Sequence, residues 1–144
     1  MKLTVIIFFS FWVITLNAQK SSTQSDRIKA QKIAFITEKV GLTSETAQKF
    51  LPVYNELSIK TDSIHKIRIS AKKRLKDEGN NLDNKQKEII VDNLINCKQK
   101  EAELIKEYHE KFKKILSIDQ LILLYDAEQE FKLKLIKQIR ESEL

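Results

Sequence analysis

Apolar and polar residues alternate along most of the chain with the period of an α-helix. Between Arg27 and Val40, after candidate caps at Ser25 or Asp26, apolar residues recur every three or four positions. The same spacing returns from Ser44 to about Lys76, then in a third segment, and in a fourth that begins at Ile118. The pattern predicts an all-α protein of about four helices, with the second and third about 48 Å long.

Short polar segments mark the breaks between these helices. Gly41 can adopt the left-handed turn that ends a helix, and Thr43 can cap the next one. Ser117 and Gln120 have the spacing of a capping box, and residues 77–81 form a loop between the second and third helices. We therefore expect two long helical hairpins whose elbows carry these caps, each cap preceded by a leucine.

Each of the three longer helices carries one broad apolar face. The faces are Phe50, Val53, Tyr54, Leu57, Ile64, Ile67, Ala71 and Leu75 in the second helix, Ile90, Leu94, Cys97, Leu104, Tyr108 and Ile115 in the third, and Leu121, Leu124, Tyr125, Glu128, Phe131, Leu135 and Ile139 in the fourth. Pro52 lies inside the second helix and predicts a kink there. Because helices of this length do not close into a compact monomer, we expect an elongated homodimer.

The amino terminus has the pattern of a secretory signal peptide, with Lys2 before an apolar run from Leu3 to Leu16. As a helix this run would be about 21 Å long, shorter than the hydrocarbon core of a membrane. Cleavage after Ala18 is therefore favoured over an uncleaved anchor. The expected segments are a cleaved signal peptide over 1–18, a flexible polar amino terminus over 19–25 and one helical domain over 26–144.

Composition narrows the classes of function. The 144 residues contain two glycines and one proline, too few turn formers for a sandwich or barrel. With only Gly41 and Gly79, no glycine-rich phosphate loop can be written, so ATP use is not expected. The formal net charge is +6. Since the amino terminus predicts export, a basic surface is expected to meet acidic or unfolded proteins or anionic lipid rather than nucleic acid.

No residue constellation indicates an enzyme, a cofactor or a metal site. His65 and His109 lack a catalytic partner motif, and Asp62 and Lys106 stand where a di-metal helix bundle would place glutamates. We interpret both histidines as solvated surface residues, with adventitious zinc binding as the alternative. Cys97 is interpreted as a small buried apolar residue, with an intermolecular disulfide as the alternative.

Seven basic residues are concentrated in the second half of the second helix, where Asp62 is the single acidic residue and isoleucines are interleaved. They are Lys60, Lys66, Arg68, Lys72, Lys73, Arg74 and Lys76. An ordinary solvated helix face is one interpretation. The other is a client-binding surface that attracts acidic or partly unfolded chains and then offers them mild hydrophobic contact.

Three segments together resemble the Spy/CpxP family of LTxxQ-motif proteins, in the versions found in Bacteroidetes. They are Leu42-Thr43 with Gln48, the run Phe50-Leu51-Pro52-Val53-Tyr54-Asn55-Glu56, and Leu116-Ser117-Ile118-Asp119-Gln120. The resemblance covers nearly all of the chain after residue 18. It implies a periplasmic, cradle-shaped antiparallel dimer that works as an ATP-independent chaperone or as a stress-sensing accessory protein.

Two functions follow from this resemblance as expectations. The first is a periplasmic holdase that binds unfolded or misfolded envelope proteins through the basic and apolar helical surface. The second is a regulatory protein that binds the sensor of an envelope-stress pathway. The motif residues Leu42, Thr43, Gln48, Leu116, Ser117 and Gln120 are interpreted as helix caps rather than client contacts.

Overall fold

The computed structural model describes residues 23–142 and contains four helices in that range. They are α1 (Gln24–Val40), α2 (Ser44–Glu78), α3 (Asn84–Phe112) and α4 (Ile118–Ser142). The predicted all-α class is confirmed. The expected signal peptide and most of the polar segment after it lie outside the described residues. No helix within the described range is long and apolar enough to cross a membrane.

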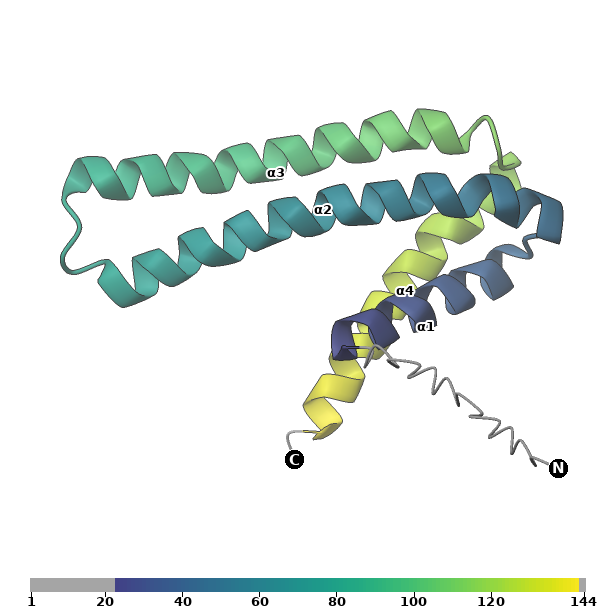
Figure 1. Ribbon diagram of the computed structural model, residues 1–144, viewed down its shortest axis with the longest axis horizontal. Helices are drawn as coiled ribbons and strands as arrows, with labels where there is room; N and C mark the ends of the chain where they lie inside the picture. The colour runs from purple at the N-terminus through teal and green to yellow at the C-terminus, as the bar shows by residue number, and fades with distance from the viewer. Residues whose placement is uncertain (1–22, 143–144) are drawn as a thin grey trace, which may run out of the picture.

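The four helices form two arms that meet at an angle (Figure 1). In the hairpin arm, α2 and α3 pack antiparallel and turn at residues 79–83, while α1 packs along α4 in the short arm. Two hairpin-like packings were expected, but the pairing differs. The predicted elbows after Gly41 and before α4 lead from one arm into the other, because α1 and α4 bury their apolar faces on each other.

The predicted helix starts at the two elbows are confirmed. Gly41 has a φ of 63°, in the left-handed region that favours glycine. The Thr43 hydroxyl accepts a hydrogen bond from the Thr46 amide at 3.2 Å. The Ser117 hydroxyl accepts from the Gln120 amide at 3.2 Å, and the Gln120 side chain accepts from the Ser117 amide at 3.1 Å. The last pair is a complete capping box.

The first helix begins earlier than predicted. Its cap is Thr23, whose hydroxyl accepts a hydrogen bond from the Asp26 amide at 3.2 Å. The Asp26 carboxylate in turn accepts from the Thr23 amide at 3.1 Å. Asp26 thus completes a capping box instead of starting the helix, and the prediction of Ser25 or Asp26 as the cap is wrong. Gln24 and Ser25, expected in a flexible segment, form the first turn of α1.

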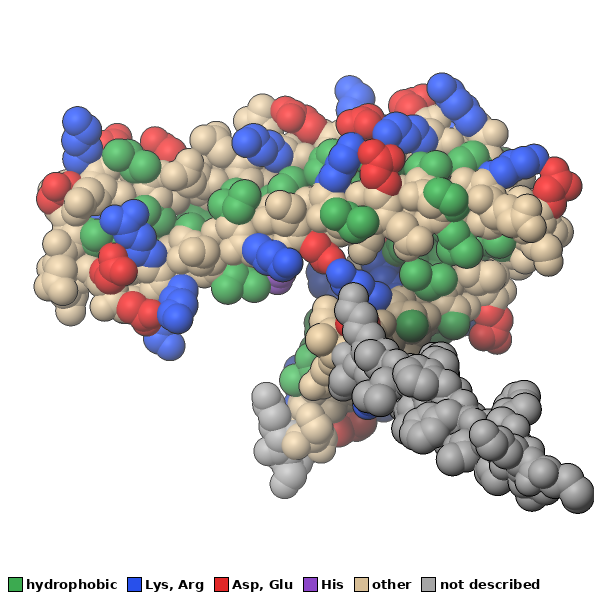
Figure 2. Space-filling model, viewed as in Figure 1, with side chains coloured by type: hydrophobic (Ala, Val, Ile, Leu, Met, Phe, Trp, Pro, Cys, Tyr) green, Lys and Arg blue, Asp and Glu red, His purple; other side chains and the backbone are tan. Residues whose placement is uncertain are grey.

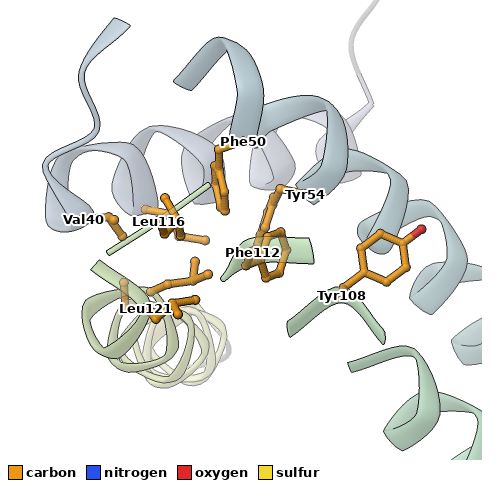
Figure 3. Close-up of a cluster of buried hydrophobic side chains, with 10 residues drawn as sticks. Val40, Phe50, Tyr54, Tyr108, Phe112, Leu116 and Leu121 are labelled. Carbon is orange, nitrogen blue, oxygen red and sulfur yellow. The ribbon is translucent and has the colours of Figure 1, made fainter. Parts of the chain in front are cut away.

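The main hydrophobic core lies where the two arms join (Figure 3). Its buried members come from all four helices and the elbow before α4: Ile36, Val40, Phe50, Tyr54, Tyr108, Phe112, Leu116, Leu121, Leu124 and Ala127. The Phe50 ring lies 5.2 Å from Tyr54 and 5.3 Å from Phe112 between centroids, so the aromatic side chains of α2 and α3 are in direct contact. This junction core holds the two arms together at their common end.

Along α2 and α3 the sequence prediction of buried positions is met in part. Ile67 and, in α4, Ile139 were assigned to apolar faces but are 54% and 51% exposed, so these two assignments are wrong. Tyr54, Ile90, Cys97 and Tyr108 are buried as expected. Phe112, four residues after Tyr108, is 2% exposed and was not assigned to the apolar face. The helix α2 continues through Pro52, which is exposed.

Candidate functional site

The outer hairpin, which we define as residues 59–105 of the hairpin arm, exposes much of its apolar surface. Seven aliphatic side chains there are 49–67% exposed: Ile59, Ile67, Ile69, Ile89, Val91, Ile95 and Ile105. Figure 2 shows hydrophobic and charged side chains intermingled along this arm. An exposed apolar surface of this kind is a candidate for contact with another molecule.

Part of this surface forms a groove between α2 and α3. The outer groove has a volume of about 370 Å³ and is lined by His65, Arg68, Ile69, Lys72, Val91, Leu94, Ile95 and Lys98. Four of the lining residues are aliphatic and the other four are basic side chains. No acidic residue is among them. The groove therefore combines an apolar surface with a basic rim.

The rim contains two ammonium groups that no carboxylate neutralises directly. The Arg68 guanidinium pairs with Glu101 at 3.0 Å and lies 2.9 Å from Nδ1 of His65. Lys72 and Lys98 are exposed, and within residues 23–142 neither forms an ion pair shorter than 4.0 Å. Lys72 and Lys98 are thus the groove cations left available to an incoming carboxylate.

The seven predicted client-binding cations do not share one face of α2. Arg68 and Lys72, one turn apart, line the outer groove, but the other five do not. Lys66 and Lys73 are two turns apart on another side of the helix and, like Lys76, are exposed. Arg74 pairs with Glu78 in the next turn, at 3.3 Å.

Lys60, the remaining member of that set, is engaged at the inner end of the hairpin arm. Its ammonium lies 2.9 Å from the Glu56 carboxylate and 5.2 Å from the centroid of the Tyr108 ring. Lys111 approaches the same ring to 3.9 Å. The Lys60 ammonium beside Glu56 holds the pKa of that carboxyl below its usual range. These contacts give Lys60 a local structural role.

A second concave surface, the inner cleft, lies between the two arms and was missed from the sequence. Its volume is about 820 Å³, and residues of all four helices line it. Glu128 of α4 accepts a hydrogen bond from the Tyr54 hydroxyl at 2.8 Å and pairs with Lys32 at 3.1 Å. Burial, reinforced by the Glu128 charge, raises the pKa of Tyr54 above its ordinary value. The sequence did contain a signal for this cleft, because Glu128 is an acidic residue on a helix face that is otherwise predicted to be apolar.

The inner cleft differs from the outer groove in its electrostatics. Its lining includes Lys29, Lys32 and Lys132 together with Asp62, Glu101 and Glu128. Lys29 pairs with Asp62, and this contact ties α1 to α2. Positive and negative side chains are therefore balanced there and largely paired. The cleft thus attracts an incoming acidic chain more weakly than the outer groove does.

The motif residues surround the junction core and do not line the outer groove. Leu116 is buried in the core and Leu42 packs against it. Thr43, Ser117 and Gln120 make the capping contacts described above, while Gln48 is exposed. In each elbow a leucine anchors the link to the core and the next residue starts a helix.

The histidines and the cysteine have different surroundings. His65 is exposed, as predicted, whereas His109 is half-buried, with Nδ1 2.7 Å from the Tyr125 hydroxyl. The interpretation of His109 as a solvated side chain is therefore wrong. Cys97 is free and 6% exposed, as expected of a small buried residue. Within residues 23–142, no group of three or more His, Cys, Asp or Glu side chains is arranged to hold a metal ion.

No protein-family model, curated protein or solved structure matches this chain.

Proposed function

We propose that this protein is a periplasmic, ATP-independent holdase of the Spy/CpxP type, which binds unfolded or stress-damaged envelope proteins. The observation that carries the proposal is the outer groove, where Ile69, Val91 and Ile95 are about half exposed beside a rim without acidic residues. An unfolded chain offers the two features that such a groove complements, which are apolar side chains and carboxylates.

The geometry supports a two-step mode of capture. Lys72 and Lys98 attract acidic segments at long range. Physiological salt screens this attraction at distances beyond about 8–10 Å. The aliphatic side chains between them then make short-range contact with the apolar residues of the client. Only four aliphatic side chains line the groove, so the contact is weak, and the client leaves when folding buries its own apolar side chains. No nucleotide takes part in this cycle.

The two groove lysines can be tested against two lysines of α2 that lie outside the groove. The test variant combines Lys72→Gln with Lys98→Gln, and the control combines Lys66→Gln with Lys73→Gln, which removes the same charge outside the groove. Aggregation of a chemically denatured acidic protein is followed without ATP at roughly 20 and 300 mM salt, which span weak and strong screening. We expect the groove variant to suppress aggregation less at low salt and to lose most of its salt dependence.

The control pair decides between a specific groove and general charge. Suppression by the Lys66/Lys73 variant should stay close to that of the wild type. Equal losses of suppression in both variants would mean that the groove is only part of a diffuse basic surface. No loss of suppression in either variant would overturn the proposal. A pull-down from envelope extract that returns one tightly bound protein would favour the regulatory function instead.

A further inference from the structure

The inner cleft has an apolar wall to which every helix contributes and which the proposed holdase function does not use. Its members are Ile28 of α1, Leu57 of α2, Ile105 of α3, and Phe131 and Leu135 of α4. Ile105 is 49% exposed, and Ile28, Leu57 and Leu135 are half-buried, whereas the Phe131 ring is buried. The accessible part of this wall is therefore aliphatic. The cleft volume of about 820 Å³ lies within the range of pockets that hold small organic ligands.

The ionised side chains of the cleft leave one positive charge unpaired. Each of the three carboxylates that line it already has a basic partner: Asp62 has Lys29, Glu128 has Lys32, and Glu101 has Arg68. Lys132 also lines the cleft, but it is exposed and forms no ion pair within residues 23–142. The cleft therefore offers a ligand one free cation beside an aliphatic surface.

We propose that the inner cleft binds a single-chain amphiphile with one negative charge, of the class of the fatty acids. The alkyl chain lies on the aliphatic side chains of the wall, and the removal of this apolar surface from water supplies most of the affinity. The carboxylate meets the Lys132 ammonium. A ligand with several negative charges fits the cleft less well, because only one cation is unpaired and three carboxylates lie close by.

The side of α4 that carries Lys132 supplies a second group for the carboxylate. Gln129 and Tyr125 also line the cleft and precede Lys132 by about one and two helical turns, so the three side chains lie on one side of the helix. The Gln129 amide can donate a hydrogen bond to a carboxylate oxygen, and a charged acceptor makes such a bond stronger. The Tyr125 hydroxyl is already engaged, at 2.7 Å from Nδ1 of His109. Lys132 and Gln129 therefore hold the carboxylate.

This site is separate from the outer groove, so the inference does not depend on the proposed holdase function. The two concave surfaces have no lining residue in common, although the ion pair between Arg68 of the groove and Glu101 of the cleft joins them. An amphiphile in the cleft would therefore leave Lys72 and Lys98 free to meet a client.

The experiment is isothermal titration calorimetry with dodecanoate, kept below the concentration at which it forms micelles. We expect saturable binding of one dodecanoate per chain. Dodecyltrimethylammonium, which has the same chain and the opposite charge, should bind at least about tenfold more weakly. Lys132→Gln should weaken the binding of dodecanoate by about tenfold, because it removes the charge that faces the carboxylate. The matched control is Lys137→Gln, which removes a charge from the same helix outside the cleft and should leave binding unchanged.

The apolar wall is tested by placing a carboxylate in it. Ile105→Glu should weaken the binding of dodecanoate by at least about tenfold, because it removes apolar contact area and repels the ligand. The matched control, Ile95→Glu in the outer groove, lies at a residue of similar exposure, 56% against 49%. It should leave dodecanoate binding intact and reduce the suppression of aggregation. Circular dichroism confirms for each variant that the helices remain folded.

Three outcomes would overturn the proposal. The first is the absence of saturable dodecanoate binding to the wild type. The second is equal affinity for dodecanoate and dodecyltrimethylammonium, which would mean that the alkyl chain adsorbs without regard to Lys132. The third is a loss of binding in Ile95→Glu but not in Ile105→Glu, which would place the ligand in the outer groove.

Discussion

The junction core and the outer hairpin use apolar residues in opposite ways, although α2 and α3 run through both. At the junction, Phe50, Tyr54 and Phe112 are at most 4% exposed and their rings touch. In the outer hairpin, isoleucines of the same two helices are about half exposed. The difference suggests that the junction supplies most of the stability, and that the outer hairpin keeps its apolar surface available for binding.

The distribution of aromatic residues follows the same division. No Phe, Tyr or Trp occurs between Asn55 and Glu107, while aromatic residues are frequent on both sides of that stretch. Buried outer residues such as Ile90 and Cys97 are smaller and widely spaced. Because large rings bury the most area per residue, their absence leaves the outer hairpin with few strong contacts between its helices.

The largest expected effect is the loss of a ring from the junction core. Phe112→Ala removes a side chain that is 2% exposed and touches Phe50, Tyr54 and Tyr108. We expect it to lower the free energy of unfolding by about 3–5 kcal/mol. The matched change in the outer hairpin, Ile95→Ala, should cost less than about 0.5 kcal/mol because Ile95 is 56% exposed. Urea denaturation measures both, and equal costs would contradict the division.

The next effect concerns the hydrogen bond that joins the arms. Tyr54→Phe removes the donor to Glu128, and we expect a cost of about 1.5 kcal/mol at neutral pH, at the low end for a charged acceptor since the Glu128 side chain is 33% exposed. In the outer hairpin, Arg68→Gln breaks the ion pair with Glu101. The side chains of Arg68 and Glu101 are 26% and 36% exposed. That change should cost less than about 1 kcal/mol.

The same tyrosine gives the wild type a distinct response to alkali. Burial, together with the Glu128 charge, raises the pKa of Tyr54 in the folded state above the ordinary value of 10.0. The stability that depends on its protonation is therefore complete below pH 10 and is lost as the pH rises beyond it, because the unfolded state then releases the proton more readily. Between about pH 9 and 11, the wild type should lose more stability than Tyr54→Phe. Parallel curves would mean that Tyr54 titrates normally.

Much of the secondary structure follows directly from local residues. Gly41 permits the left-handed turn, and Ser117 with Gln120 makes reciprocal bonds that need no distant partner, so both elbows could be located from the sequence. The start of α1 was misplaced because Thr23, Ser25 and Asp26 are all good capping residues within one turn. Only the reciprocal bonds between Thr23 and Asp26 decide among them.

The pairing of helices and the binding surfaces could not be read in the same way. An apolar period tells which face of a helix is buried but not which helix covers it, so α1 was expected to pair with α2 rather than with α4. Neighbouring cations along a helix point to different sides. The sequence therefore grouped Lys66 with Lys72, whereas only Lys72 borders the groove. Lys98, which completes the rim, lies on α3, too far along the chain for a local pattern to include it.

The smallest expected effect comes from the helix caps, which are alike in both regions. Ser117 at the junction and Asp83 at the tip of the hairpin each make a capping box, with Gln120 and Gln86 respectively. Because the bonds are local, Ser117→Ala and Asp83→Ala should each cost about 1 kcal/mol, within the usual range of roughly 0.5–2. Thermal melting measures both, and Thr43→Ala adds a third cap for comparison.

None of these three changes alters the outer groove, so suppression of aggregation should persist below the melting transition. An unchanged melting temperature with lost suppression in Ser117→Ala or Thr43→Ala would instead make the elbow motif a contact site for clients. A much larger cost at Ser117 than at Asp83 would mean that the junction elbow depends on its cap for the angle between the arms as well as for the start of α4.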